Sequence, residues 1–107
     1  MLQSMLIEDK NNAGAGKTHT TDSEKRTFQA WLSAAGGTAT VVIEVSNDPR
    51  AESDPASAAW QELGSISLSG ANDKAGFTSD APWFYVLGRL AVPTGAASVS
   101  AAMGYPY

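Results

Sequence analysis

Apolar and polar residues alternate with a period of two through most of the chain, and this pattern predicts β-strands. The clearest case is residues 38–46, in which every odd-numbered position from Ala39 to Val45 is apolar. Four further segments with a similar period are predicted as strands: residues 27–33, 60–69, 83–92 and 97–103. No segment has an apolar period of helical length, so the pattern predicts an all-β protein.

The stretch from Trp60 to Val92 has the strongest pattern of two strands joined by a turn. Its first strand alternates serines with Ile66 and Leu68, its second is the most apolar segment of the chain, and residues 69–74 supply glycine, asparagine and aspartate for the turn. We therefore expect an antiparallel pair. The second strand is apolar on both faces and should be central. Gly64 predicts a bulge in the first strand.

The first 26 residues differ in composition from the rest. Residues 2–7 are apolar enough for a first strand or for an arm that pairs with a neighbouring subunit, whereas residues 10–26 have no hydrophobic period and predict a long exposed loop. We expect this N-terminal arm or strand plus loop over residues 1–26 and a β-sandwich over residues 27–107, within a single domain. Six to eight strands at this spacing indicate an antiparallel, jelly-roll-like β-sandwich with an extended N-terminal arm.

Composition and charge narrow the classes of partner. The 107 residues suit one domain with a modest core, and a net charge of −4 argues against a nucleic-acid partner, because phosphate contacts require a basic surface. The longest apolar run is far too short to cross a bilayer, and the N-terminus does not resemble a secretion signal. The absence of cysteine excludes disulfides and thiolate metal sites, and it fits synthesis in a reducing cytoplasm.

Three segments contain residue types that are used in catalysis or ligand binding. Residues 13–18 resemble a phosphate-binding loop, but Asn11 stands where that motif needs glycine, and no helix follows. His19 has no nucleophile or orienting carboxylate nearby, so we expect a solvated side chain. The acidic loop Asp48–Asp54 could offer oxygen ligands to calcium, although solvated acids are the favoured interpretation. We therefore expect no enzyme activity, catalytic residue, cofactor or metal ion, and leave calcium at this loop open.

Exposed apolar and aromatic side chains are the candidates for subunit contacts, because tryptophan, tyrosine and arginine dominate interface hot spots. Trp31 lies among polar neighbours, and the aromatic tail from Gly104 cannot continue a strand through Pro106. For the strand at 83–92, packing and interface roles are equally favoured. The candidate interface residues are Leu2, Met5, Leu6, Ile7, Trp31, Trp83, Tyr85, Arg89, Tyr105 and Tyr107.

Three segments carry a resemblance to a known family. They are V-V-I-E-V-S-N-D-P at 41–49, W-Q-E-L-G-S-I-S-L-S-G at 60–70 and G-F-T-S-D-A-P-W-F-Y-V-L-G-R-L at 76–90. Over about residues 38–103 the chain resembles small structural proteins of tailed bacteriophages, and its pattern is also similar to jelly-roll ligand-binding modules. The resemblance implies structural rather than catalytic roles for the matching residues Ser46, Asn47, Asp48, Trp60 and Trp83.

The resemblance implies a non-enzymatic virion protein, made in the host cytoplasm. We expect a capsid cement or decoration protein that forms a homo-oligomer and stabilises the shell through contacts with the major capsid protein or other virion subunits. No membrane partner is expected. The alternative is a neck or tail accessory protein, or a carbohydrate- or receptor-binding module of a phage tail, with Trp31 and Trp83 as stacking platforms.

Overall fold

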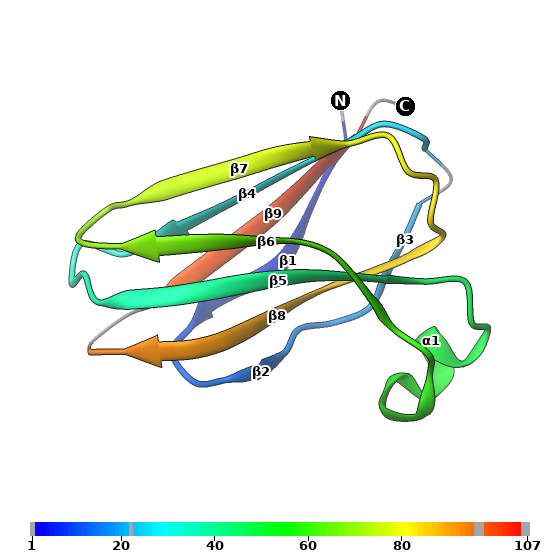
Figure 1. Cartoon of the computed structure of the whole chain (residues 1–107), viewed down its shortest axis with the longest axis horizontal. Coiled ribbons are helices and arrows are strands. Elements are labelled where there is room, and N and C mark those ends of the chain that lie inside the picture. Colours follow the sequence, from blue (N-terminus) through cyan, green and yellow to red (C-terminus); the bar gives the residue numbers. More distant parts are fainter. Residues whose placement is uncertain (1, 22, 96–97, 106–107) are drawn as a thin grey trace.

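Two antiparallel sheets pack face to face in the computed structural model, which describes residues 2–21, 23–95 and 98–105 (Figure 1). Sheet A has the order β1-β9-β4-β7, and sheet B has the order β2-β8-β5-β6, with β3 also paired to β8. The strands of sheet A are β1 (Leu2–Lys10), β4 (Arg26–Leu32), β7 (Lys74–Ser79) and β9 (Val99–Tyr105). Those of sheet B are β2 (Gly14–Ala15), β3 (His19–Thr20), β5 (Thr38–Ser46), β6 (Gln61–Ser69) and β8 (Tyr85–Thr94). The predicted all-β sandwich is confirmed.

Strand pairing in the two sheets is nested along the chain. β1 pairs with β9, β2 and β3 pair with β8, β4 pairs with β7, and β5 pairs with β6. The second partner of β4 is β9, and the second partner of β5 is β8. All of these pairs are antiparallel, so early and late parts of the chain lie side by side throughout the molecule.

The predicted strand segments are confirmed with small shifts, but the expected pairing of the strands on either side of the 69–74 turn is wrong. β6 and β8 both belong to sheet B, where they flank β5 instead of pairing with each other. The chain between them crosses to sheet A and forms β7, a strand that the sequence pattern did not reveal. β8 lies inside sheet B, as expected for a strand that is apolar on both faces.

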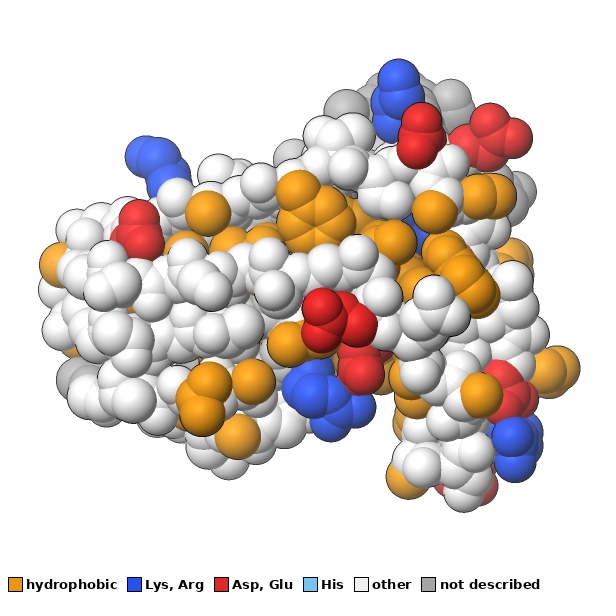
Figure 2. Space-filling view, viewed as in Figure 1, with side chains coloured by type: hydrophobic (Ala, Val, Ile, Leu, Met, Phe, Trp, Pro, Cys, Tyr) orange, Lys and Arg blue, Asp and Glu red, His pale blue; other side chains and the backbone are white. Residues whose placement is uncertain are grey.

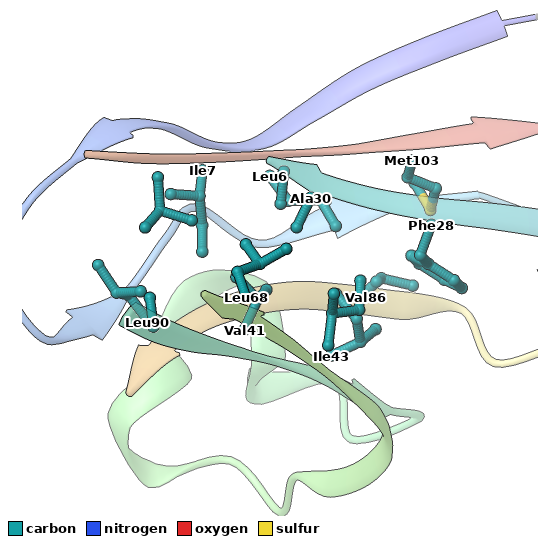
Figure 3. Close-up of a cluster of buried hydrophobic side chains, with 14 of the residues drawn as sticks. Leu6, Ile7, Phe28, Ala30, Val41, Ile43, Leu68, Val86, Leu90 and Met103 are labelled. Atoms are coloured by element: carbon teal, nitrogen blue, oxygen red, sulfur yellow. The ribbon is translucent and has the colours of Figure 1, made fainter. Parts of the chain in front are cut away.

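The core lies between the sheets and consists of the inward-facing residues of both (Figure 3). Val41, Ile43 and Val45 of β5 are fully buried, as their alternation predicted. Sheet A contributes Phe28 and Met103, which point toward these residues. The molecule is a thin slab of 37 × 30 × 17 Å, consistent with two sheets packed about 10 Å apart.

β1 is an edge strand of sheet A rather than an arm. Its pairing with β9 shifts register between Met5 and Ile7, and Leu6 is the extra residue of this bulge. Leu6 and Ile7 are only 2% and 3% exposed and pack over Gly88 of β8, where even a Cβ atom would crowd them. The interface role predicted for Leu6 and Ile7 is therefore wrong, because a bulge turns two consecutive side chains into the core.

The described residues of 10–26 are irregular over most of their length and seldom buried, as their composition predicted, but two short strands attach them to the sandwich. β2 and β3 pair with β8, and the N–H of Gly16 donates to the carbonyl of Gly88 at 2.7 Å. The segment thus closes the side of the sandwich between β1 and β8, and we call it the strap. The sequence did not reveal this attachment, because these contacts use backbone groups, which leave no hydrophobic period. His19 was expected to be solvated, but the structure places it half-buried in the strap.

Candidate interaction surfaces

The outer face of sheet A is flat and almost uncharged. In register, Gly104 of β9 lies between Gln3 and Thr27, and Ala102 lies between Met5 and Gln29. The next row places Trp31 of β4 between Ser100 and Lys74. Among the described residues, the ionisable side chains in these rows are Lys74 and, beside Ser100, Asp9, whose carboxylate accepts a hydrogen bond from the Ser100 hydroxyl at 3.4 Å. Little charge has to be desolvated when such a face meets another protein.

Met5 and Trp31 are the large apolar side chains of this face. Met5 is 40% exposed, and Trp31 is half-buried. The small side chain of Ala102 leaves a hollow of about 390 Å³ that is lined by Gln3, Ser4, Met5, Gln29, Trp31 and Ala102. A rigid indole and a flexible thioether beside a hollow form a suitable anchor point for an apolar side chain of a partner. We call this hollow and its lining the sheet A patch.

The outer face of sheet B carries a lobe at one end, formed by α1 (Arg50–Ser53) and η1 (Pro55–Ser57) (Figure 1). Asp48 holds the two ends of this lobe together through hydrogen bonds and an ion pair. Its carboxylate accepts hydrogen bonds from the N–H groups of Arg50 and Ala59 and forms an ion pair with the Arg50 guanidinium at 2.7 Å. These contacts, that to the Arg50 side chain first, hold the pKa of Asp48 well below its ordinary value.

Two further hydrogen bonds attach the lobe to the rest of the molecule. The hydroxyl of Ser46 donates to the carbonyl of Ala59 at 2.6 Å, and the hydroxyl of Thr18 in the strap donates to the carbonyl of Ala51 at 2.8 Å. The described residues hold no group of three or more histidine, cysteine, aspartate or glutamate residues that could bind a metal ion. Of the acidic residues in this loop, Asp48 is thus engaged in the structure of the lobe itself.

A cleft of about 340 Å³ separates the lobe from the face of sheet B; its lining residues are Ala15, Gly16, Pro55, Ala56, Trp60, Leu87 and Arg89. Figure 2 shows the molecular surface hollowed between the lobe and the body of the sandwich. The indole N–H of Trp60 donates to the carbonyl of Pro55 at 2.9 Å, which fixes the ring at the cleft wall. Leu87, 1% exposed, lies at its base. The Nε of Arg89 donates to Glu44 at 2.7 Å.

The other predicted interface residues are spread over the molecule. Trp83 and Tyr105 pack partly buried against the core, whereas Tyr85 is half-buried and contacts Phe84 edge to face. The side chain of Leu2, and all of Tyr107, lie outside the described residues. The structure therefore brings Met5 and Trp31 together on one face and places Arg89 at the cleft.

The Trp60 cleft was missed by sequence reasoning. An unbroken alternation would place Trp60 on the same face as Ile66 and Leu68, but the register of β6 shifts between Glu62 and Gly64, as the predicted bulge requires. The signal that could have revealed the cleft is this same break in phase, which turns Trp60 away from the core.

Comparisons with known proteins do not assign the chain to a family. No protein-family model matches the chain, and no curated protein matches it. In the described residues, no helix has the length and apolar character required to span a bilayer.

Proposed function

We propose that the protein is a non-enzymatic structural protein of a tailed-bacteriophage particle, specifically a capsid cement or decoration protein. The sheet A patch is the observation that carries this proposal, because it combines an exposed methionine and a half-buried tryptophan beside a hollow with few charged side chains around them. The resemblance of residues 38–103 to structural proteins of tailed bacteriophages is the reason for assigning the protein to a phage particle. In this proposal the protein resides on the virion and binds the major capsid protein or another shell subunit.

The nested strand pairing supports the proposal that this β-sandwich is a jelly roll. A long hairpin wound into two sheets pairs first strand with last, second with second-last, and so on inward, as expected of a jelly roll. If β2 and β3 count as one interrupted strand, the pairing here follows that order. Jelly rolls are common in viral capsids, which agrees with the proposed location.

The proposed mechanism is stabilisation by preferential binding. A protein that binds the assembled shell better than free subunits shifts assembly toward the shell by mass action. Many symmetric copies add to this effect. In place of the apolar arm that the sequence predicted, the contact is made by the sheet A patch, since Leu6 and Ile7 are committed to the core.

Substitution of the patch tests the proposal. Trp31→Ala and Met5→Ala should each weaken binding to purified particles that lack the protein by about tenfold or more, because hot-spot side chains contribute at least 1–2 kcal/mol. Co-sedimentation with particles over a range of protein concentrations measures the copies bound and the Kd. Phe84→Ala is the matched control, because Phe84 is 44% exposed but lies off the patch. Wild-type binding by both patch variants would overturn the proposal.

The cleft favours a second candidate function, a carbohydrate-binding module of a phage tail. One face of a sugar ring presents C–H groups that stack on an indole, while planar polar side chains hydrogen-bond its hydroxyls. Trp60 and the Arg89–Glu44 pair provide both features beside the cleft, so Trp60 replaces Trp31 and Trp83 as the stacking platform in this alternative.

A glycan array separates the two functions. The alternative predicts a bound glycan whose signal falls at least tenfold on Trp60→Ala and Arg89→Ala, persists in Trp31→Ala, and is insensitive to chelator because Asp48 is held by Arg50. Circular dichroism establishes that both variants fold. A glycan signal that survives both substitutions, or no signal for the wild type, would rule the alternative out.

A further inference from the structure

The four sheet edges of this molecule are not protected equally. Exposed edge strands offer unpaired backbone groups to other strands, and proteins block them with bulges, short strands or covering segments. β1 is bulged, β2 and β3 have two residues each, and β6 has a register shift. In contrast, β7 pairs with β4 over its whole length, from Lys74 to Ser79, with no shift. Within the described chain, β7 is the one edge strand of more than two residues that pairs along its whole length without a register shift.

The side of the sandwich beside β7 is also open. The strap closes the opposite side, but between β7 and β6 the apolar side chains reach the surface, as Figure 2 shows over these two strands. Phe77 and Leu63 are only partly buried there. The Phe77 ring lies 5.1 Å from the ring of Phe28 and rests on Gly64, where a Cβ atom would collide with it. An addition to β7 would cover this apolar seam.

The charges of β7 identify the partner as a second copy of the chain. Lys74 and Asp80 lie three residues before and three residues after Phe77, and both are exposed. The ion pairs recorded among the described residues involve neither of them. An antiparallel copy of the same strand, centred on Phe77, would place each Lys74 opposite the partner's Asp80. A lysine on an edge strand normally discourages pairing with another strand. In this arrangement the partner's Asp80 neutralises the charge of Lys74.

We propose that two copies associate through β7, antiparallel about a two-fold axis at Phe77. The two four-stranded sheets then form one continuous sheet of eight strands, in the order β1-β9-β4-β7 followed by its mirror sequence. Phe77 meets its symmetry mate at the axis and covers the seam, while Gly76 lies opposite Thr78. Lys74 and Asp80 form an ion pair at each end. The inference does not depend on the proposed function.

Charge reversal in trans provides a sharp test. Lys74→Glu and Asp80→Lys each place like charges opposite one another twice per dimer, so each variant alone should raise the dimer Kd about tenfold. An equimolar mixture of the two variants restores both ion pairs between unlike chains. Association in the mixture should therefore return to the wild-type level. Sedimentation velocity over a range of concentrations at low salt measures all three samples.

A lysine that lies away from β7 provides the control for charge reversal. Lys17→Glu changes the net charge by the same amount as Lys74→Glu, but this exposed residue lies between β2 and β3, away from β7, so it should leave the dimer Kd unchanged. A monomeric wild type at all concentrations, or a dimer that Lys74→Glu does not weaken, would overturn the proposal. It would also be overturned if the two variants failed to associate when mixed, because that result excludes the register centred on Phe77.

Discussion

A buried arginine seals one end of the sandwich. Arg26 is 1% exposed and donates hydrogen bonds to the carbonyls of Ser23 and Thr21 at 3.0 and 3.1 Å and to the carbonyl of Trp83. Burial lowers its pKa, yet the guanidinium has a high enough ordinary value to stay charged. Arg26 thereby ties the corner before β4 to the chain entering β8. The sequence offered no sign of this, since the residue followed a charged, irregular segment.

Removal of this side chain should be costly. Arg26→Ala leaves buried carbonyls of Thr21 and Trp83 without a donor and opens a cavity, so we expect a loss of about 2–4 kcal/mol in the free energy of unfolding. Urea denaturation followed by tryptophan fluorescence measures it. Lys25→Ala, at the exposed neighbouring position, should change the stability by less than about 0.5 kcal/mol. Equal denaturation midpoints for the two variants would contradict the sealing role.

At the scale of elements, strands were predictable where side chains determined them. Residues 38–46 alternate strictly because their odd-numbered side chains form the core, and their bounds match β5. β7 was missed because Gly76 and Ala75 give its faces little contrast, with Phe77 as its one large apolar residue. The strap was missed because it is held by backbone pairing. The Met5–Trp31 contact face depended on the register of β1, β9 and β4, which no local pattern specifies.

The strap makes the stability of the fold depend on pH. The Nε2 of His19 is buried without a hydrogen-bond partner in the described residues, and burial, together with nearby Lys17, lowers its pKa below the ordinary 6.5. Protonation therefore favours the unfolded chain, in which the imidazole keeps its ordinary pKa. The contribution of neutral His19 is complete above pH 6.5 and is lost as the pH falls toward the folded-state value.

We expect the unfolding midpoint of the wild type to fall between about pH 7.5 and about pH 5 more steeply than that of His19→Gln, which cannot be protonated. Chemical denaturation at several pH values gives both curves. Hydrogen exchange at Gly16, whose N–H bonds to Gly88, reports whether the strap opens first. Parallel curves for the wild type and the variant would show that His19 does not carry this dependence.

At the scale of the whole molecule, the proposed contacts lie on separate surfaces. The sheet A patch, the Trp60 cleft on sheet B and the β7 edge can all be occupied at once. Pairing through β7 places two sheet A patches on one continuous sheet, facing the same way. Two such patches bind a regular array with a higher effective concentration than one, which would strengthen attachment to a shell of repeated subunits.

The position of β9 in sheet A has a consequence for biosynthesis. β9 follows the other eight strands in the chain, yet it lies between β1 and β4, and β1 has no other neighbour in its sheet. A nascent chain therefore carries β1 without a partner while β2 to β8 are translated. β4 and β7 can pair before this, but the layer is completed only when β9 leaves the ribosomal exit tunnel, and its long-range pairing makes that step slow. Chaperones that shield the nascent β1 and β4 should accordingly raise the yield of folded protein.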